Sequence, residues 1–330
     1  MTASAEGAPI VDIEDLTRVF HVRRKSSGPV RRRTRGTVVA VDEMTFQIRP
    51  GESVGYIGAN GAGKSTTIKM LCGILVPTAG RVRTCGLDPL KSRRELSRRI
   101  GVVFGQRSQL WWDLPLRESF SILAAIHRLD PAAAGRRTDE LVEQLEMGAT
   151  LDTPVRQLSL GQRMRAEIAA ALLHSPALLI LDEPTIGLDV VSKARLREFL
   201  IQERASRGTT LLLTTHDMGD VERLCDRLLV VDHGRLAYDG TLPGLAATVG
   251  AQRVLVVDLV QPPPDLLDVE GTTHLGSEAE GLRQRLAFDP EVTTAAEVLA
   301  AVALEAEIRD LSIEEPDIED VVRRIYLSGR

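Results

Sequence analysis

Residues 58–66 read GANGAGKST, and this stretch decides how the rest of the chain is interpreted. Its glycines let backbone N–H groups converge on a polyphosphate without a Cβ in the way. The apolar run 53–57 predicts a buried strand before it, and the apolar periodicity of 68–75 predicts a helix after it. The N-terminus of such a helix favours an anion through its dipole and its free N–H groups. The residues predicted to contact a nucleotide are Gly58, Asn60, Gly61, Gly63, Lys64, Ser65 and Thr66.

Two short polar stretches, one in this loop and one at the end of a later apolar run, predict where Mg²⁺ and the attacking water lie. In the loop, Lys64 is predicted to reach the β- and γ-phosphates of ATP, and Ser65 to offer its hydroxyl to Mg²⁺. Residues 178–183 read LLILDE, and four consecutive aliphatic residues are typical of a strand buried on both faces of a parallel sheet. Asp182 at its end is predicted to bind Mg²⁺ directly or through water, and Glu183 to act as the general base. An acidic pair at a strand end is often only solvated, but the phosphate loop upstream favours the catalytic interpretation.

Residues 158–162 read LSLGQ and precede a helix rich in Arg and Ala. At this point the chain resembles the ATP-binding subunits of ABC transporters, whose signature is Leu-Ser-Gly-Gly-Gln. Leu160 replaces the central glycine, whereas Ser159 and Gly161 are kept, so we expect the departure to have a mild effect. The resemblance implies that Ser159, Gly161 and Gln162 grip the γ-phosphate held by a second subunit, as the anion-binding end of a helix. Without the other motifs, Ser159 would be interpreted as an ordinary helix N-cap.

A glutamine loop follows the next predicted strand, 100–104. In the family, the glutamine here contacts Mg²⁺ and water and faces the membrane subunit. The resemblance implies that Gln106 has this role. Gln109 is the weaker candidate because it lies further from the strand. Residues 103–115 also resemble a narrower branch of exporter ATPases, of the daunorubicin-resistance and viologen-exporter types. Trp111 and Trp112 are expected to line the groove for a helix of the membrane subunit, or to pack the helical subdomain onto the core. Both interpretations can hold for different rings.

Three further residues take roles that only the resemblance implies. Asp189 lies in a loop that crosses to the partner subunit. His216 follows a predicted strand and is the switch histidine that contacts the γ-phosphate, although a single histidine after a strand is more often surface or core. Phe20 stands where the family more often has a tyrosine that stacks on adenine. A ring face is all that stacking needs, and a plain core role for Phe20 is the alternative.

Composition sets limits on the remaining functions. The chain has 330 residues and a net charge of −5, which argues against a general nucleic-acid binder. No run approaches the roughly 18 apolar residues of a membrane span, and residues 1–9 lack the apolar segment of a secretory signal. Cys72, Cys85 and Cys225 show no metal or disulfide spacing and are expected to be packing residues in a reducing compartment. Together with these limits, the resemblance implies a peripheral protein on the cytoplasmic face of the cell membrane.

The expected fold is α/β: a P-loop NTPase with a RecA-like parallel-sheet core, an antiparallel β subdomain, an inserted helical subdomain and a small C-terminal α+β domain. A terminal hairpin is expected at 234–240, with Asp239-Gly240 as its turn signal. After about residue 245 the motifs stop. We expect strands at 253–260 and 282–288, a helix at 294–304 capped by Thr294 and a closing helix at 318–327. This last domain is expected to be regulatory or to support dimerisation. The expected boundaries are 1–245 for the ATP-binding cassette, 107–165 for the helical subdomain, 23–36 for a basic loop, and 246–330 for the C-terminal domain.

The mechanism that the resemblance implies is ATP-driven dimerisation that powers export through separate membrane subunits. Because the chain has one phosphate loop, we expect a homodimer with two ATP sites, each completed by the signature of the other subunit. A pair with a different ATPase is the alternative. The alternative is a single-cassette ATPase with an assembly role away from the membrane. A degenerate scaffold without hydrolysis is disfavoured because Lys64, Asp182, Glu183 and His216 are all present.

Overall fold

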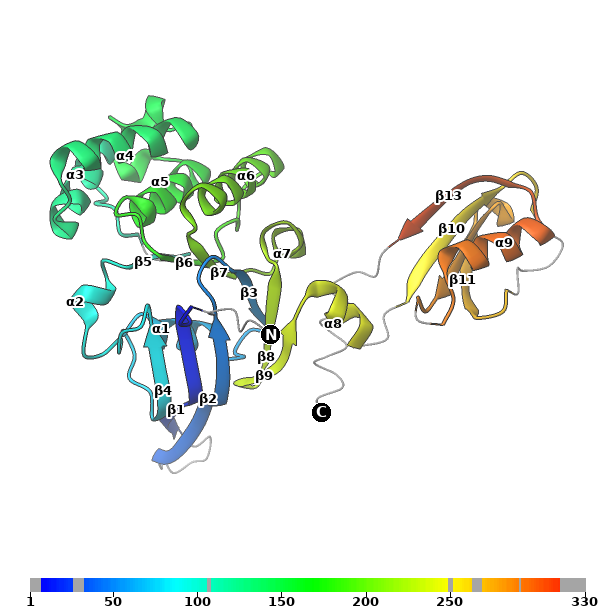
Figure 1. Cartoon of the computed structure of the whole chain (residues 1–330), viewed down its shortest axis with the longest axis horizontal. Coiled ribbons are helices and arrows are strands. Elements are labelled where there is room, and N and C mark those ends of the chain that lie inside the picture. Colours follow the sequence, from blue (N-terminus) through cyan, green and yellow to red (C-terminus); the bar gives the residue numbers. More distant parts are fainter. Residues whose placement is uncertain are drawn as a thin grey trace, which may run out of the picture. The chain divides into compact units, whose positions relative to one another are not determined.

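A computed structural model describes residues 7–25, 33–105, 108–248, 252–262, 269–290 and 292–314 (Figure 1). It divides the chain into two compact units, residues 1–240 and 241–330. The division falls shortly before the expected boundary at 245, because helix α8 (Leu242–Thr248) groups with the second unit. Among the described residues, no helix combines the length and the apolar character needed to cross a membrane.

The first unit is built on a six-stranded sheet in the order β5-β6-β7-β3-β8-β9, parallel except for β9. Leu178 and Ile180 of β6 point into one hydrophobic core and Leu179 and Leu181 into another, which confirms a strand buried on both faces. The strands are β3 (Ser53–Gly58), β5 (Ile100–Phe104), β6 (Leu178–Asp182), β7 (Thr210–Thr214), β8 (Arg227–Asp232) and β9 (Arg235–Gly240).

The hairpin that closes this sheet turns at a different place from the one expected. Its two turn residues are His233 and Gly234, with φ of 47° and 82°, rather than the Asp239-Gly240 pair. Positive φ at both central residues matches the twist of the strands. Asp239 and Gly240 lie inside β9, where they pair with Leu229 and Leu228 of β8.

A second, three-stranded antiparallel sheet has the order β2-β1-β4, with β1 (Val11–Lys25), β2 (Arg33–Ile48) and β4 (Ala79–Thr84). The expected basic loop 23–36 is wrong at both ends, since β1 runs through Lys25 and pairs it with Arg33 of β2. A hairpin ladder is made by backbone groups, so it continues through a segment whose composition is typical of a loop. Residues 26–32 lie outside the described part of the chain.

Helices cover the core sheet, with α3 to α6 on one side and α1 on the other (Figure 1). Helix α4 begins at Pro131, because the Asp130 carboxylate accepts from Ala133 N and proline fits the first turn. The bounds are α1 (Lys64–Leu71), α2 (Arg93–Leu96), α3 (Leu116–His127), α4 (Pro131–Gln144), α5 (Leu160–Leu172), α6 (Val190–Arg207) and α7 (Met218–Leu224).

A buried ion pair joins the helical subdomain to the rest of the unit. Arg137 of α4 and Glu203 of α6 are 6% and 4% exposed, and the Arg137 guanidinium contacts the Glu203 carboxylate. Glu140, one turn further along α4, lies 3.1 Å from Arg137 and 2.6 Å from Arg207 of α6. These four side chains form a charged network that fixes α4 against α6.

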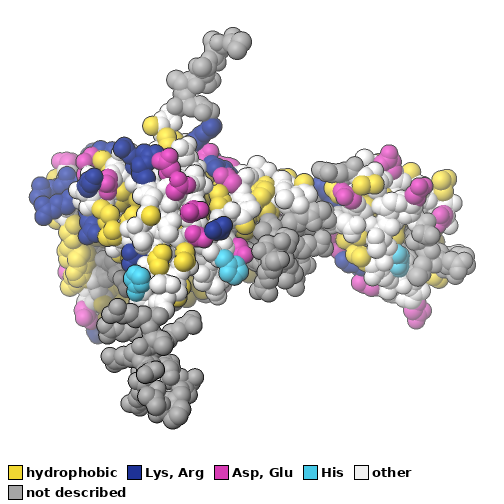
Figure 2. Space-filling view, turned by 90° about the horizontal axis from the view of Figure 1, so that it is seen from below, with side chains coloured by type: hydrophobic (Ala, Val, Ile, Leu, Met, Phe, Trp, Pro, Cys, Tyr) yellow, Lys and Arg dark blue, Asp and Glu magenta, His cyan; other side chains and the backbone are white. Residues whose placement is uncertain are grey.

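One end of the first unit is basic despite the negative net charge. Lys and Arg side chains gather there, at the end where α2 lies (Figure 2). Arg93, Arg94 and Arg98 are exposed on and just after this helix, as is Arg99, which pairs with Glu95. The net charge of −5 therefore averages over an uneven surface.

The second unit is an antiparallel sheet in the order β11-β12-β10-β13, with α9 packed on one face. The predicted strands around 253–260 and 282–288 and the helix capped by Thr294 are confirmed, whereas β11 and β13 were not predicted. The helix expected at 318–327 lies outside the described residues. The bounds are β10 (Arg253–Leu259), β11 (Thr272–Glu278), β12 (Arg283–Phe288), α9 (Ala295–Glu305) and β13 (Ile308–Glu314).

Candidate nucleotide site

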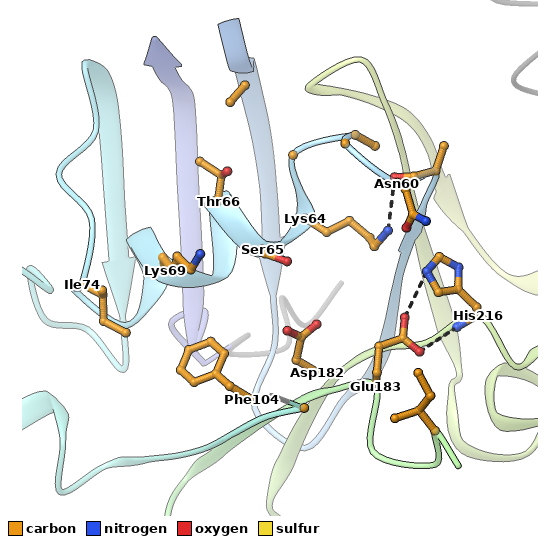
Figure 3. Close-up of a pocket in the computed structure, with 17 residues that line it drawn as sticks. Asn60, Lys64, Ser65, Thr66, Lys69, Ile74, Phe104, Asp182, Glu183 and His216 are labelled. Atoms are coloured by element: carbon orange, nitrogen blue, oxygen red, sulfur yellow. Dashed lines mark hydrogen bonds and ion pairs between the residues drawn. The ribbon is translucent and has the colours of Figure 1, made fainter. Parts of the chain in front are cut away.

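A cavity of about 710 Å³ opens at the carboxyl ends of the parallel strands (Figure 3). This is where α/β sheets bind ligands, because loops and helix N-termini converge there. The loop between β3 and α1 forms one wall, and the ends of β6 and β7 form the other. The predicted site residues that line the cavity are Asn60, Gly61, Gly63, Lys64, Ser65, Thr66, Asp182, Glu183 and His216.

Two glycines are required by the close packing of the phosphate loop. Gly63, the N-cap of α1, has φ of 105°, and a Cβ there would lie 2.3 Å from the Ala40 carbonyl oxygen on β2. A Cβ at Gly58 would lie 2.5 Å from the Val231 carbonyl oxygen on β8. The loop is therefore held between two strands that come from opposite ends of the first unit in sequence. Gly58 does not line the cavity, so it shapes the loop from behind.

Lys64 is positioned by the loop that it belongs to. Its side chain is 9% exposed, and Nζ donates to the carbonyl oxygens of Gly58 at 2.5 Å and Ala59 at 3.3 Å. Burial lowers the pKa of Lys64, while the charges of Glu183 and Asp182 oppose that shift. The ammonium and the two carboxylates thus interact across one cavity.

The two carboxylates at the end of β6 have different partners. Asp182 Oδ1 accepts from Thr214 Oγ1 at 2.5 Å, and the side chain points toward Ser65 (Figure 3). Glu183 has a left-handed backbone with φ of 56°, a conformation that costs about 1–2 kcal/mol in a residue with a side chain. This turn aims Glu183 at His216, whose Nε2 lies 3.2 Å from Oε1 and whose backbone N donates to Oε2 at 3.3 Å.

The signature residues lie outside this cavity. Ser159 caps α5 and exchanges two hydrogen bonds with Gln162: its N donates to Gln162 Oε1 at 2.8 Å, and its Oγ accepts from Gln162 N at 3.2 Å. Asp189 caps α6 through its side chain alone, accepting from Ser192 N at 2.9 Å and from Ser192 Oγ at 2.6 Å. Gly161, two residues after Ser159, likewise does not line the cavity. The structure therefore separates the signature from the phosphate loop within one chain.

Leu160 links the signature to the loop before α6. Its side chain is 42% exposed, and a Cβ at Gly187 would lie 2.5 Å from Leu160 Cδ2, so the two residues are in contact. Gly187 has φ of 71°, a conformation that favours glycine. The leucine that replaces the usual glycine thus packs on the residues that precede Asp189.

The remaining predicted residues have mixed outcomes. Phe20 does not line the cavity; it pairs with Val38 on β2 and its ring lies 4.6 Å below the Arg18 guanidinium. Gln106 lies outside the described residues. Trp111 packs partly against the helical core, whereas Trp112 is 50% exposed, with the Arg163 guanidinium 5.5 Å from its ring. By exposure, Trp112 fits the interpretation as a contact for the membrane subunit, and Trp111 fits the interpretation as packing of the helical subdomain onto the core.

Several residues that line the cavity were missed by sequence reasoning. They include Ala40, Lys69, Ile74, Phe104 and Ile186. Phe104 is the last residue of β5, beside the end of β6, so the rule that ligands bind at strand ends would have found it. Ala40 and Ile74 come from a distant strand and from the chain after α1, and neither carries a polar group that signals a site.

Comparison with known proteins gives one family. A family model described as "ABC transporter" matches residues 41–186. The chain is 36% identical to "Nod factor export ATP-binding protein I" of Cupriavidus metallidurans, over 91% of this chain and 95% of that protein. It is 36% identical to "Daunorubicin resistance ATP-binding protein DrrA3" of Streptomyces coeruleorubidus, over 67% and 70% of the two chains. A solved "ATP binding subunit of ABC transporter" is similar with a TM-score of 0.62, 27% identity and coverage of 73% and 94%.

Proposed function

The chain belongs to the family of ABC transporter ATP-binding proteins, which hydrolyse ATP for transport. From this membership we propose that it powers export as a homodimer bound to separate membrane subunits. The observation that carries the proposal is the convergence of Lys64, Asp182, Glu183 and His216 on one cavity. Export is supported by relatives whose names specify Nod factor export and daunorubicin resistance.

In the proposed dimer, each ATP lies between the phosphate loop of one subunit and the signature of the other. Lys64 and the N–H groups at the start of α1 would hold the phosphates, as helix N-termini hold anions. Ser159 and Gly161 lie outside the cavity of their own chain, which supports a role toward a second subunit. One phosphate loop per chain then gives two equivalent sites.

The oxygen groups of the cavity suit Mg²⁺, a hard cation that prefers such ligands. We assign the Ser65 hydroxyl, Asp182 and Gln106 as its holders. Asp182 fits this role because one of its oxygens is fixed by Thr214 while the side chain points toward Ser65 (Figure 3). When bound, the ion would neutralise charge that develops on the phosphate oxygens.

Glu183 is assigned as the general base and His216 as the group that positions it. A carboxylate held at both oxygens by one residue has a fixed direction, so it can accept a proton from a water placed in line with the γ-phosphate. His216 can also contact the γ-phosphate itself, because its ring lines the same cavity. Positioning of this kind is the main source of catalysis in phosphoryl transfer.

We assign the membrane subunit to the surface around Trp112, with Gln106 as the second contact that the resemblance implies. We further propose that the protein acts on the cytoplasmic face of the membrane. An exposed tryptophan beside an arginine is a composition enriched at interfaces. Trp111, by contrast, stabilises the helical subdomain from inside. The alternative assembly role away from the membrane predicts no such partner.

We expect a tagged Glu183→Gln chain, incubated with ATP and Mg²⁺ in detergent-solubilised membranes, to recover a protein with several membrane spans. Adding Trp112→Ala should abolish that recovery. The control is Ile201→Ala on α6, an apolar residue of similar exposure (48%) that should leave recovery unchanged. If only partners without membrane spans are recovered, transport is excluded in favour of the assembly role, and the ATPase activity stands.

Replacing Leu160 with glycine tests whether the altered signature is a mild departure. We expect the kcat of ATP hydrolysis to change by less than about 3-fold, because Ser159 and Gly161 keep their places. The free energy of unfolding should fall by less than about 1 kcal/mol, since glycine costs entropy but Leu160 is the first residue of α5 and not an interior one. Steady-state ATPase assays and thermal unfolding measure the two. A tenfold loss of kcat would mean that the contact between Leu160 and Gly187 is needed for turnover.

A further inference from the structure

A buried carboxylate on the signature helix holds the segment that follows the glutamine loop. Glu167 of α5 is 6% exposed. One carboxylate oxygen accepts from the Ser108 hydroxyl, and the other accepts from Gln109 N at 3.2 Å. Gln109 Nε2 donates to the Glu167 backbone oxygen at 3.0 Å. Gln109 is thus engaged by α5 and does not line the nucleotide cavity.

The chain beyond this contact belongs to the helical subdomain. Ser108 Oγ also accepts from Leu110 N at 3.1 Å, and Leu110 is 6% exposed in the helical core. Trp111 N donates to Ser119 Oγ on α3 at 3.2 Å. From Ser108 onward, the backbone is therefore fixed to α5 and α3.

The chain before this contact belongs to the core sheet. Phe104 pairs with Asp182 in the register of β5 and β6, and both residues line the nucleotide cavity. A Cβ at Gly105 would lie 3.0 Å from the Asp182 carbonyl oxygen, so the backbone of Gly105 lies against the end of β6. In the sequence, only Gln106 and Arg107 separate this anchor from Ser108.

We propose that Glu167 is a positioning residue that couples the signature helix to the edge of the nucleotide cavity. With both anchors fixed, three Cα–Cα steps span at most about 11 Å. A displacement of α5 therefore cannot be absorbed by a long loop and must act on Gly105, at the edge of the cavity. This inference rests on the proposed function, in which ATP closes the signature of one subunit on the site of the other.

The electrostatics of the contact suit a hydrogen-bonding role. Burial raises the pKa of Glu167, opposed by the hydrogen bonds from Ser108 and Gln109 and by the charge of Arg163. We therefore expect the Glu167 carboxyl group to act mainly by holding Ser108 and Gln109 in place. Glutamine has the same shape and can keep both contacts, because its oxygen can accept from Gln109 N and its amide can donate to Ser108 Oγ.

The test compares Glu167→Ala and Glu167→Gln with Ile168→Ala in the full chain. Ile168 is the next residue of α5 and is 0% exposed. Its side chain has no group that could hydrogen-bond to residues 108–110, so Ile168→Ala controls for lost stability. We expect Glu167→Ala to lower kcat for ATP at least 10-fold with KM changed less than about 3-fold, as for an interaction made in the transition state. Glu167→Gln should retain kcat within about 3-fold, and Ile168→Ala should lose stability but retain kcat.

A second measurement does not depend on turnover. In a Glu183→Gln background, hydrogen exchange at the amides of 108–110 should respond to ATP when Glu167 is present and not in Glu167→Ala. The proposal is overturned if Glu167→Ala matches Ile168→Ala in both kcat and exchange, or if Glu167→Gln is as damaged as Glu167→Ala. If the wild-type chain hydrolyses no ATP, the proposed mechanism fails, and the exchange result alone decides whether Glu167 couples the two anchors.

Discussion

Replacing Glu183 with glutamine is expected to lower the kcat of ATP hydrolysis by about 100-fold to 10,000-fold, the range of general-base catalysis. Glutamine has the same shape, and its oxygen can still accept from His216 N, so the cavity should keep its form. It cannot accept a proton from water, however. ATP affinity should change by less than about 3-fold, because the phosphate contacts come from Lys64 and the loop backbone.

The measurement combines steady-state hydrolysis with equilibrium binding of ATP and Mg²⁺. Glu143→Gln is the matched control, since Glu143 is exposed on α4 and far in sequence from the site. It should leave both quantities unchanged. Near wild-type turnover in Glu183→Gln would show that another group accepts the proton, and the assignment of the base would then be wrong.

The second large effect concerns stability. Glu203→Ala should lower the free energy of unfolding of the first unit by about 3–5 kcal/mol, because it leaves the buried charge of Arg137 without its main partner. Glu140, at 3.1 Å from Arg137, is more exposed and offsets only part of this loss. For a domain of this size, the expected fall in Tm is about 6–20 °C.

Calorimetry of the full chain can follow the transition of the first unit. Glu198→Ala on the same helix is the control, because Glu198 is exposed and its removal should change stability by less than about 0.5 kcal/mol. Replacing Arg137 and Glu203 together with leucine should restore most of the loss, since no unpaired charge then remains buried. A single Glu203→Ala that unfolds like the wild type would mean that water enters and solvates Arg137.

Sequence reasoning found the elements that a short run of neighbouring residues specifies by itself. The aliphatic run that ends at Asp182 is typical of a strand buried on both faces, and the structure places β6 there. The phosphate loop was equally evident from glycine spacing, although α1 begins at Lys64, four residues before the predicted start. The helix N-terminus itself forms part of the loop, so an apolar pattern locates the helix too late.

What sequence reasoning missed depends on contacts between distant residues. The basic run around Lys25 and Arg33 has loop composition, yet backbone pairing extends the hairpin through its ends. Strand β13 is largely exposed, although residues 310–314 alternate polar and apolar side chains, so sequence reasoning passed over a short signal for a strand here. Glu167 is one charge in an Arg-rich helix, and its contact with Ser108 spans 59 residues. No local pattern predicts that contact.

The strand order has a consequence for synthesis on the ribosome. The strand that carries the phosphate loop, β3, lies between β7 and β8, which are made about 150 residues later. At 5–20 residues per second, β3 waits roughly 10–30 s for its neighbours. Gly58 meets Val231 only after that delay. ATP therefore cannot template the early steps of folding, and its stabilising effect on a nascent chain should begin only when the first unit is nearly complete.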